Sequence, residues 1–163
     1  MDLDNTPSNA NRAINRLGLY QHQLASTPST SPMARDPITC HVLNTLTGTP
    51  AANLPVTLTL LSGITPIEFT ATTNADGRVG QWVNNNDKTV GGVLASLASV
   101  DSKTNWSVRF AVGPWYEAQG VESFWPEIEV KFTVKGVGEG PGWRHYHVPV
   151  LLGPWNYSTY RGS

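Results

Sequence analysis

From Ile38 onward, apolar and polar residues alternate along most of the chain with a period of two. Val56, Leu58 and Leu60 alternate with threonines, which is typical of a strand with one face on a hydrophobic core. Turn residues, such as those at 74–77, separate the runs. The pattern predicts about eight short strands, at 38–43, 56–61, 66–73, 78–82, 105–112, 127–134, 144–151 and 155–160. Strands of this number and spacing predict an all-β sandwich or barrel.

Two segments interrupt the strand pattern. Residues 83–104 form a long connection, in which we expect a helical turn around residues 93–97. Residues 114–120 begin with Pro and end with Gly, as a short helix does.

The first 35 residues differ from the rest. The stretch at 26–32 is polar and contains two prolines, a composition that buries too little apolar surface to fold alone. We therefore expect a flexible, disordered leader at 1–35 and one folded domain at 36–163.

Composition narrows the possible partners. Charged residues make up 14% of the 163 residues, against about 25% in typical globular proteins. The net charge of -1 argues against nucleic acid as a partner, and no apolar run is long enough to span a membrane. The single cysteine excludes an internal disulfide, and the first residues lack the apolar core of a secretory signal. A secreted β-sandwich adhesion domain is therefore disfavoured.

Cys40 and His41 suggest a thiol nucleophile with its base, but they cannot form such a pair. Adjacent residues on a strand point to opposite faces. Cys40 shares its face with Ile38 and Val42, so we expect it in the core as a small hydrophobe.

His145 and His147 lie two residues apart on a predicted strand and share a face. With His41 they form a possible three-histidine metal site, although no further ligand follows at a telling spacing. Spacing alone leaves open that some of these histidines are ordinary surface or core residues.

Five segments resemble one known family. Residues 146–152 and 157–163 are similar to the C-terminal signature of 5-hydroxyisourate hydrolases, whose final Tyr-Arg-Gly-Ser separates the enzymes from the transthyretin carriers. Residues 38–44, 73–78 and 124–128 resemble further motifs of that family, in the same order. Asn44 and Gly153 depart from the family pattern, where Asp and Ser are usual.

The resemblance implies a transthyretin-like two-sheet β-sandwich of about eight strands with one short helix. It also implies hydrolysis of 5-hydroxyisourate to 2-oxo-4-hydroxy-4-carboxy-5-ureidoimidazoline, in urate breakdown towards allantoin, with neither metal nor cofactor. A homotetramer, a dimer of dimers, is the assembly implied. The alternative is a transthyretin-like carrier of a small ligand, which needs neither the histidine and arginine set nor the Tyr-Arg-Gly-Ser end.

Matched position by position, the resemblance implies catalytic roles for His41, Arg78 and His147. It implies substrate-binding roles for Tyr160, Arg161, Gly162 and Ser163, and we keep His145 as a lesser candidate. A histidine can take a proton from the attacking water, and an arginine can stabilise the negative charge that develops. We expect the Ser163 carboxylate to orient Arg78 or a histidine. Sequence does not decide which histidine is the base.

The leader carries a pattern that fits this pathway. Arg16 and Leu17, followed after five residues by Gln23 and Leu24, resemble an N-terminal peroxisomal targeting signal. In a helix the four side chains lie on one face, where an import receptor can bind them together. The expected location is the peroxisome, and otherwise the cytoplasm.

Overall fold

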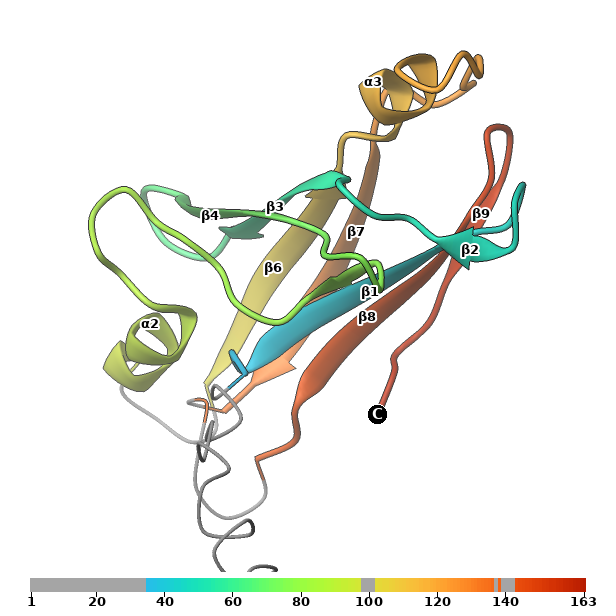
Figure 1. The fold of residues 1–163 in the computed structure, drawn as a ribbon. Helices are drawn as coiled ribbons and strands as arrows, with labels where there is room; N and C mark the ends of the chain where they lie inside the picture. Colours follow the sequence, from blue (N-terminus) through green and yellow to red (C-terminus); the bar gives the residue numbers. More distant parts are fainter. Residues whose placement is uncertain (1–34, 98–101, 137, 139–142) are drawn as a thin grey trace, which may run out of the picture. The chain divides into compact units, whose positions relative to one another are not determined.

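The computed structural model describes residues 35–97, 102–136, 138 and 143–163. Of the predicted leader at 1–35, residues 1–34, with Arg16, Leu17, Gln23 and Leu24, lie outside these residues. In the part of the chain that the structure describes, two β-sheets carry most of the regular structure (Figure 1). No helix in that part is long and apolar enough to cross a membrane.

The first sheet, sheet A, contains the strands nearest the two ends of the described chain. Its strands are β1 (Ile38–Asn44), β2 (Thr49–Pro50), β5 (Arg78–Val79), β8 (Tyr146–Leu152) and β9 (Tyr157–Thr159). They run in the order β2-β1-β8-β9, and β5 also pairs with β1. β1 and β8 are parallel, while the other pairs are antiparallel. Residues about a hundred positions apart in the sequence therefore lie side by side.

The second sheet, sheet B, is antiparallel throughout. Its strands are β3 (Pro55–Leu60), β4 (Ile67–Thr72), β6 (Lys103–Phe110) and β7 (Ile128–Lys135), in the order β4-β3-β6-β7. β7 thus lies at an edge of sheet B, as β9 lies at an edge of sheet A.

Two short helices lie in the two predicted interruptions. α2 (Val90–Ser96) begins after Thr89, whose hydroxyl accepts a hydrogen bond from the backbone N–H of Gly92 at 3.0 Å. α3 (Val112–Glu117) begins two residues before the expected start at Pro114. Proline is compatible with a first helical turn, so the difference is one of boundaries.

The core consists mainly of the inward-facing residues of both sheets, joined by residues of α2, α3 and the loops. Val56, Leu58 and Leu60 alternate with less buried threonines, as the period of two predicts. Trp106 and Phe69 from sheet B are fully buried. Cys40 is also fully buried, and burial raises the pKa of its thiol to about 12. Its predicted role as a core hydrophobe is confirmed.

Some strand boundaries differ from those predicted. The strand expected at 78–82 is only two residues long, because the chain leaves the ladder with β1 after Val79 and Val83 forms an isolated bridge with Thr70 of β4 in sheet B. The indole N–H of Trp82 donates to the Ile38 carbonyl, and its backbone N–H donates to Asp36 Oδ2, both at 2.8 Å. β2 was not predicted, since two residues show no alternation.

Candidate active site

One face of sheet A carries the candidate catalytic residues. On β1, Cys40 and Val42 point into the core, so Thr39 and His41 point to the opposite face. The parallel register with β8 places Thr39 beside His147. The same alternation that builds the core therefore brings two predicted site residues to one surface.

A tight turn places Arg78 on this face. The side-chain oxygen of Asn74 accepts hydrogen bonds from the backbone N–H groups of Asp76 at 3.0 Å and Arg78 at 2.9 Å. Gly77 has a φ of 71°, and a Cβ there would collide with the carbonyl oxygen of Val42. The turn thus fits closely against β1, and β5 starts with Arg78 opposite His41 in the antiparallel ladder.

The Thr39 hydroxyl joins two histidines. Its Oγ1 lies 2.8 Å from Nε2 of His145 and 2.8 Å from Nδ1 of His147. The two imidazole rings are stacked, with centroids 6.5 Å apart and an interplanar angle of 26°. His145, the lesser candidate, is therefore directly linked to His147.

The end of the chain packs against His147. The backbone N–H of Gly162 donates to the His147 carbonyl at 2.9 Å, and the two residues form an isolated β-bridge. The guanidinium of Arg161 lies 4.9 Å from the centre of the Tyr146 ring, a cation–π distance. The Tyr-Arg-Gly-Ser segment is thus held beside the histidines by backbone and side-chain contacts.

Two hollows adjoin this segment. One, of about 370 Å³, lies beside β7 and β8 and is lined by Tyr160 and Arg161 among others. The other, of about 410 Å³, is lined by Arg144, His145, Arg161, Gly162 and Ser163. All four residues with predicted substrate-binding roles line one hollow or the other.

The environment favours neutral histidines. Burial lowers the pKa of His147 most, and positive or potentially positive neighbours lower it further, in the order Arg78, His145, His41 and Arg35. Neutral imidazole is the form that can accept a proton.

The other two histidines are shifted in the same direction. Burial, followed by Arg78, lowers the pKa of His41, against the opposing effects of a hydrogen bond to the Asp76 backbone and of the Asp76 carboxylate. Burial and then Arg35 lower the pKa of His145.

The geometry brings together most of the predicted site. His41, Arg78 and His147 lie on one face, with His145 linked to His147 through Thr39. Sequence reasoning missed Thr39, although its position two residues before His41 already placed both side chains on one strand face.

The Ser163 carboxylate, which we expected to orient Arg78 or a histidine, forms no ion pair with a described residue. Ion pairs among the described residues of this chain are Arg109–Glu127 and Lys131–Glu129. Nor do the described residues contain a group of three or more His, Cys, Asp or Glu side chains arranged to hold a metal ion.

Known proteins that are similar to this chain in sequence and in structure identify its family. A probable 5-hydroxyisourate hydrolase of Schizosaccharomyces pombe is 40% identical over 146 residues, covering 86% of this chain and all of the relative. The structure of Klebsiella pneumoniae 5-hydroxyisourate hydrolase matches with a TM-score of 0.56 and 26% identity, covering 77% of this chain and 97% of that one.

The fold is shared with carriers as well as enzymes. The crystal structure of transthyretin from Sparus aurata matches with a TM-score of 0.59 and 23% identity, over 78% of this chain and 97% of that one. The fold alone therefore does not separate the two functions. The model of the HIUase/Transthyretin family matches residues 38–162. This chain belongs to the HIUase/Transthyretin family.

Proposed function

We propose that this protein hydrolyses 5-hydroxyisourate in urate breakdown. The main support is the grouping of His41, His147 and Arg78 on one face of sheet A, where burial and the arginine favour neutral imidazoles. The relatives named 5-hydroxyisourate hydrolase support the same substrate. A carrier needs a shaped apolar channel, but it needs no neutral base beside a cation.

The reaction opens a ring by adding water to a carbonyl carbon. Water is a weak nucleophile near neutral pH, so a base must take its proton during the attack. A neutral His41 or His147 can do so, and Arg78 stays positively charged and can stabilise the developing oxyanion. The hollow lined by Gly162 and Ser163 lies beside His145 and offers space for a small substrate.

We further propose the homotetramer that is usual for this family. β7 and β9 lie at sheet edges, where unpaired backbone groups can extend a sheet into a second copy. Leu151 on β8 and Tyr160 are 41% and 62% exposed in the single chain, which suits burial against another copy. Light scattering coupled to gel filtration should give a mass about four times the 17.7 kDa of one chain; a monomer would contradict the assembly.

The activity is tested by a coupled assay. Urate and urate oxidase generate 5-hydroxyisourate, and its ultraviolet absorbance is followed after this protein is added. We expect decay much faster than the spontaneous rate, lost in His41→Ala and His147→Ala but kept in a variant of sheet B, Arg109→Gln. Decay at the spontaneous rate from a folded protein would contradict the enzyme and favour the carrier.

We also propose that the leader directs the protein to peroxisomes. Arg16, Leu17, Gln23 and Leu24 carry this proposal through their spacing alone. Residues 1–35 fused to a fluorescent protein should co-localise with a peroxisomal marker, and the double variant Arg16→Ala/Leu17→Ala should be diffuse. A diffuse signal from the unaltered fusion would contradict the proposal.

A further inference from the structure

Thr39 is a polar residue only 4% exposed, and its hydroxyl lies between two imidazoles at 2.8 Å from each. We propose that Thr39 and His145 form a proton relay that sets the protonation state of His147 during hydrolysis. This inference rests on the proposed function. In it, Thr39 and His145 are positioning residues that act through His147.

The Thr39 hydroxyl restricts which nitrogen carries the proton on each of the two histidine rings. Thr39 has one O–H hydrogen, so it donates to one ring nitrogen and accepts from the other. In the first arrangement, His147 Nδ1–H donates to Thr39, and Thr39 donates to Nε2 of His145. In the second, His145 Nε2–H donates to Thr39, and Thr39 donates to Nδ1 of His147.

The two arrangements give His147 opposite chemical roles. In the first, both neutral rings carry their proton on Nδ1, so the Nε2 of His147 has a free lone pair and can act as a base. In the second, both rings carry their proton on Nε2, so His147 can act as an acid. Thr39 thus couples the tautomers of the two rings. When His147 takes a proton on Nε2 and passes its Nδ1 proton through Thr39 to His145, it changes from a base to an acid.

The proton steps balance over one turnover. As an O–H bond of water breaks, its proton moves to Nε2 of His147 and the oxygen adds to the carbonyl carbon. The Nδ1 proton of His147 passes to Thr39, whose own proton passes to Nε2 of His145. His145 then carries the positive charge and the substrate carries the oxyanion.

The second half of the turnover reverses the relay. When the carbon–nitrogen bond breaks, the leaving nitrogen takes the proton from Nε2 of His147. His145 returns its proton through Thr39 to Nδ1 of His147, and both rings are neutral again. One water is consumed, and the protein gains and loses no proton.

The surroundings of His145 favour a short-lived charge. Burial and Arg35 lower its pKa, and Arg144 and Arg161 line the hollow beside it. Around His147, the facing groups are Arg78, His41 and Arg35, which also oppose a lasting charge. A proton placed on His145 is therefore readily returned, as the second half of the reaction requires.

The first test compares Thr39→Val with Thr39→Ser in the full-length protein. Valine keeps the size of the side chain and removes the hydroxyl, whereas serine keeps the hydroxyl. We expect Thr39→Val to lower kcat on the order of tenfold, a part of the loss expected for removing a general base, with KM changed by less than about twofold. Thr39→Ser should restore most of the kcat.

A solvent isotope measurement separates a relay from a packing effect. In mixtures of light and heavy water, kcat of the unaltered protein should depend on deuterium fraction along a curve, because several protons move. The dependence should be linear in Thr39→Val and in His145→Gln, since glutamine can hydrogen-bond to Thr39 but does not titrate. Unchanged kcat in both variants, with an active unaltered protein, would overturn the relay and leave the proposed function intact.

A second test needs no substitution at the relay. Nitrogen-15 NMR of the unaltered protein above pH 8 reports which ring nitrogen carries the proton. Both rings should share one tautomer, either both on Nδ1 or both on Nε2. A mixed pair would overturn the relay, even if Thr39→Val failed to fold. An inactive unaltered protein in the coupled assay would contradict the proposed function instead.

Discussion

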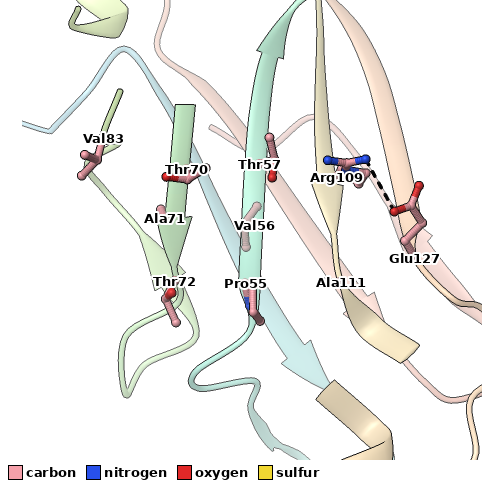
Figure 2. A pocket seen from close by; sticks show the side chains of 10 residues that line it. All are labelled: Pro55, Val56, Thr57, Thr70, Ala71, Thr72, Val83, Arg109, Ala111 and Glu127. Atoms are coloured by element: carbon pink, nitrogen blue, oxygen red, sulfur yellow. Dashed lines mark ion pairs between the residues drawn. The ribbon is translucent and has the colours of Figure 1, made fainter. Parts of the chain in front are cut away.

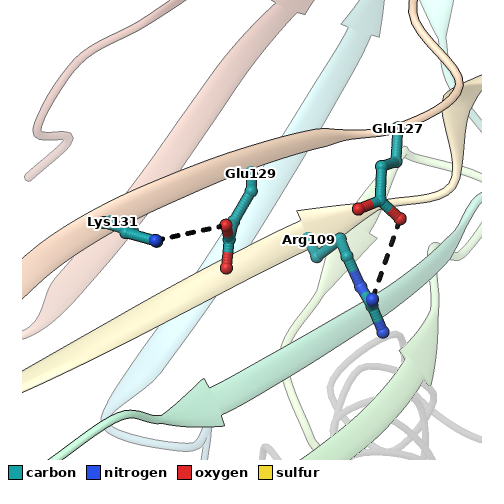
Figure 3. A network of polar contacts seen from close by, with 4 residues as sticks. All are labelled: Arg109, Glu127, Glu129 and Lys131. Carbon is teal, nitrogen blue, oxygen red and sulfur yellow. Dashed lines mark ion pairs between the residues drawn. The ribbon is translucent and has the colours of Figure 1, made fainter.

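The two outward faces of the sandwich differ in how their charges are compensated. On sheet B, Arg109 lies 3.7 Å from Glu127 and Lys131 lies 3.6 Å from Glu129, so these two cations each have a carboxylate partner (Figure 3). On sheet A, Arg78 forms no ion pair among the described residues and lies opposite His41. Among the described residues, the guanidinium of Arg78 is therefore not held in an ion pair and can interact with an anionic transition state.

The volumes of the hollows on the two faces do not distinguish the candidate site as the charges do. A groove of about 700 Å³ crosses sheet B, lined mainly by threonines and small apolar residues (Figure 2). It is larger than the hollow of about 410 Å³ beside His145. The groove has Arg109 and Glu127 as its charged residues, and they neutralise each other. The grouping of Arg78 with the histidines, and not volume, distinguishes the candidate site.

The largest effect on activity should follow removal of the positive charge of Arg78. Arg78→Gln keeps a polar side chain but removes the charge that stabilises the oxyanion, and kcat/KM should fall by about 10² to 10³. The matched variant on the other face, Arg109→Gln, should keep kcat/KM within about twofold. Both are measured in the coupled assay. Equal losses in the two variants would mean that the two faces do not differ in function.

A smaller loss should follow from crowding the end of the chain against His147. In Gly162→Ala the added Cβ would lie 2.6 Å from Cδ2 of His147 and 2.9 Å from Cγ of Pro149, so the segment or the ring must shift. A shift of this kind should lower kcat/KM by about ten- to a hundredfold.

Gly80→Ala is the control for that crowding. A Cβ at Gly80 would meet only Arg35 Cγ, at 3.8 Å, which is ordinary contact. Thermal unfolding of both variants, with activity measured well below the transition, separates a local shift from loss of the fold. Full activity in Gly162→Ala would show that the segment does not position His147.

The alternation of apolar and polar residues along the strands made much of the fold and of the candidate site predictable from the sequence. It assigned Cys40 to the core, separated it from His41, and placed His145 and His147 on one face. It could not supply the parallel pairing of β1 with β8, because no local pattern records which of the nine strands in the described residues will be neighbours. The bridge from Thr39 to His145 spans 106 positions and depends on that pairing.

The pH dependence of kcat/KM should distinguish the histidines on the face of sheet A from histidines with an ordinary pKa. All three histidines have a pKa below the usual value of about 6.5. The acid limb of kcat/KM should therefore lie below pH 6.5, and more than about a quarter of the maximum should remain at pH 6. An acid limb at or above pH 6.5 would contradict the neutral cluster.

The lowered histidine pKa values should also make the free energy of unfolding depend on pH. As the pH falls, the unfolded chain binds protons at these histidines first, because its histidine pKa values are higher. The free energy of unfolding should therefore decrease as the pH falls from about 6.5 through the lower pKa values of the folded protein. Urea unfolding between pH 8 and pH 5 measures this decrease, which should be smaller in His147→Ala. Equal pH dependence in the two proteins would contradict a lowered pKa at His147.

The smallest effect is expected on sheet B, at the pair Arg109 and Glu127. Their side chains are 46% and 51% exposed, so water screens the attraction at 3.7 Å, and holding both side chains costs conformational entropy. A double-mutant cycle with Arg109→Ala and Glu127→Ala should give a coupling free energy of about 0.5 kcal/mol or less in urea unfolding. Hydrolysis should be unchanged in both single variants, because neither residue lies on the face that carries the histidines. A coupling free energy well above 1 kcal/mol would contradict the screening of this ion pair by water. A loss of turnover in either single variant would remove the functional contrast between the two faces.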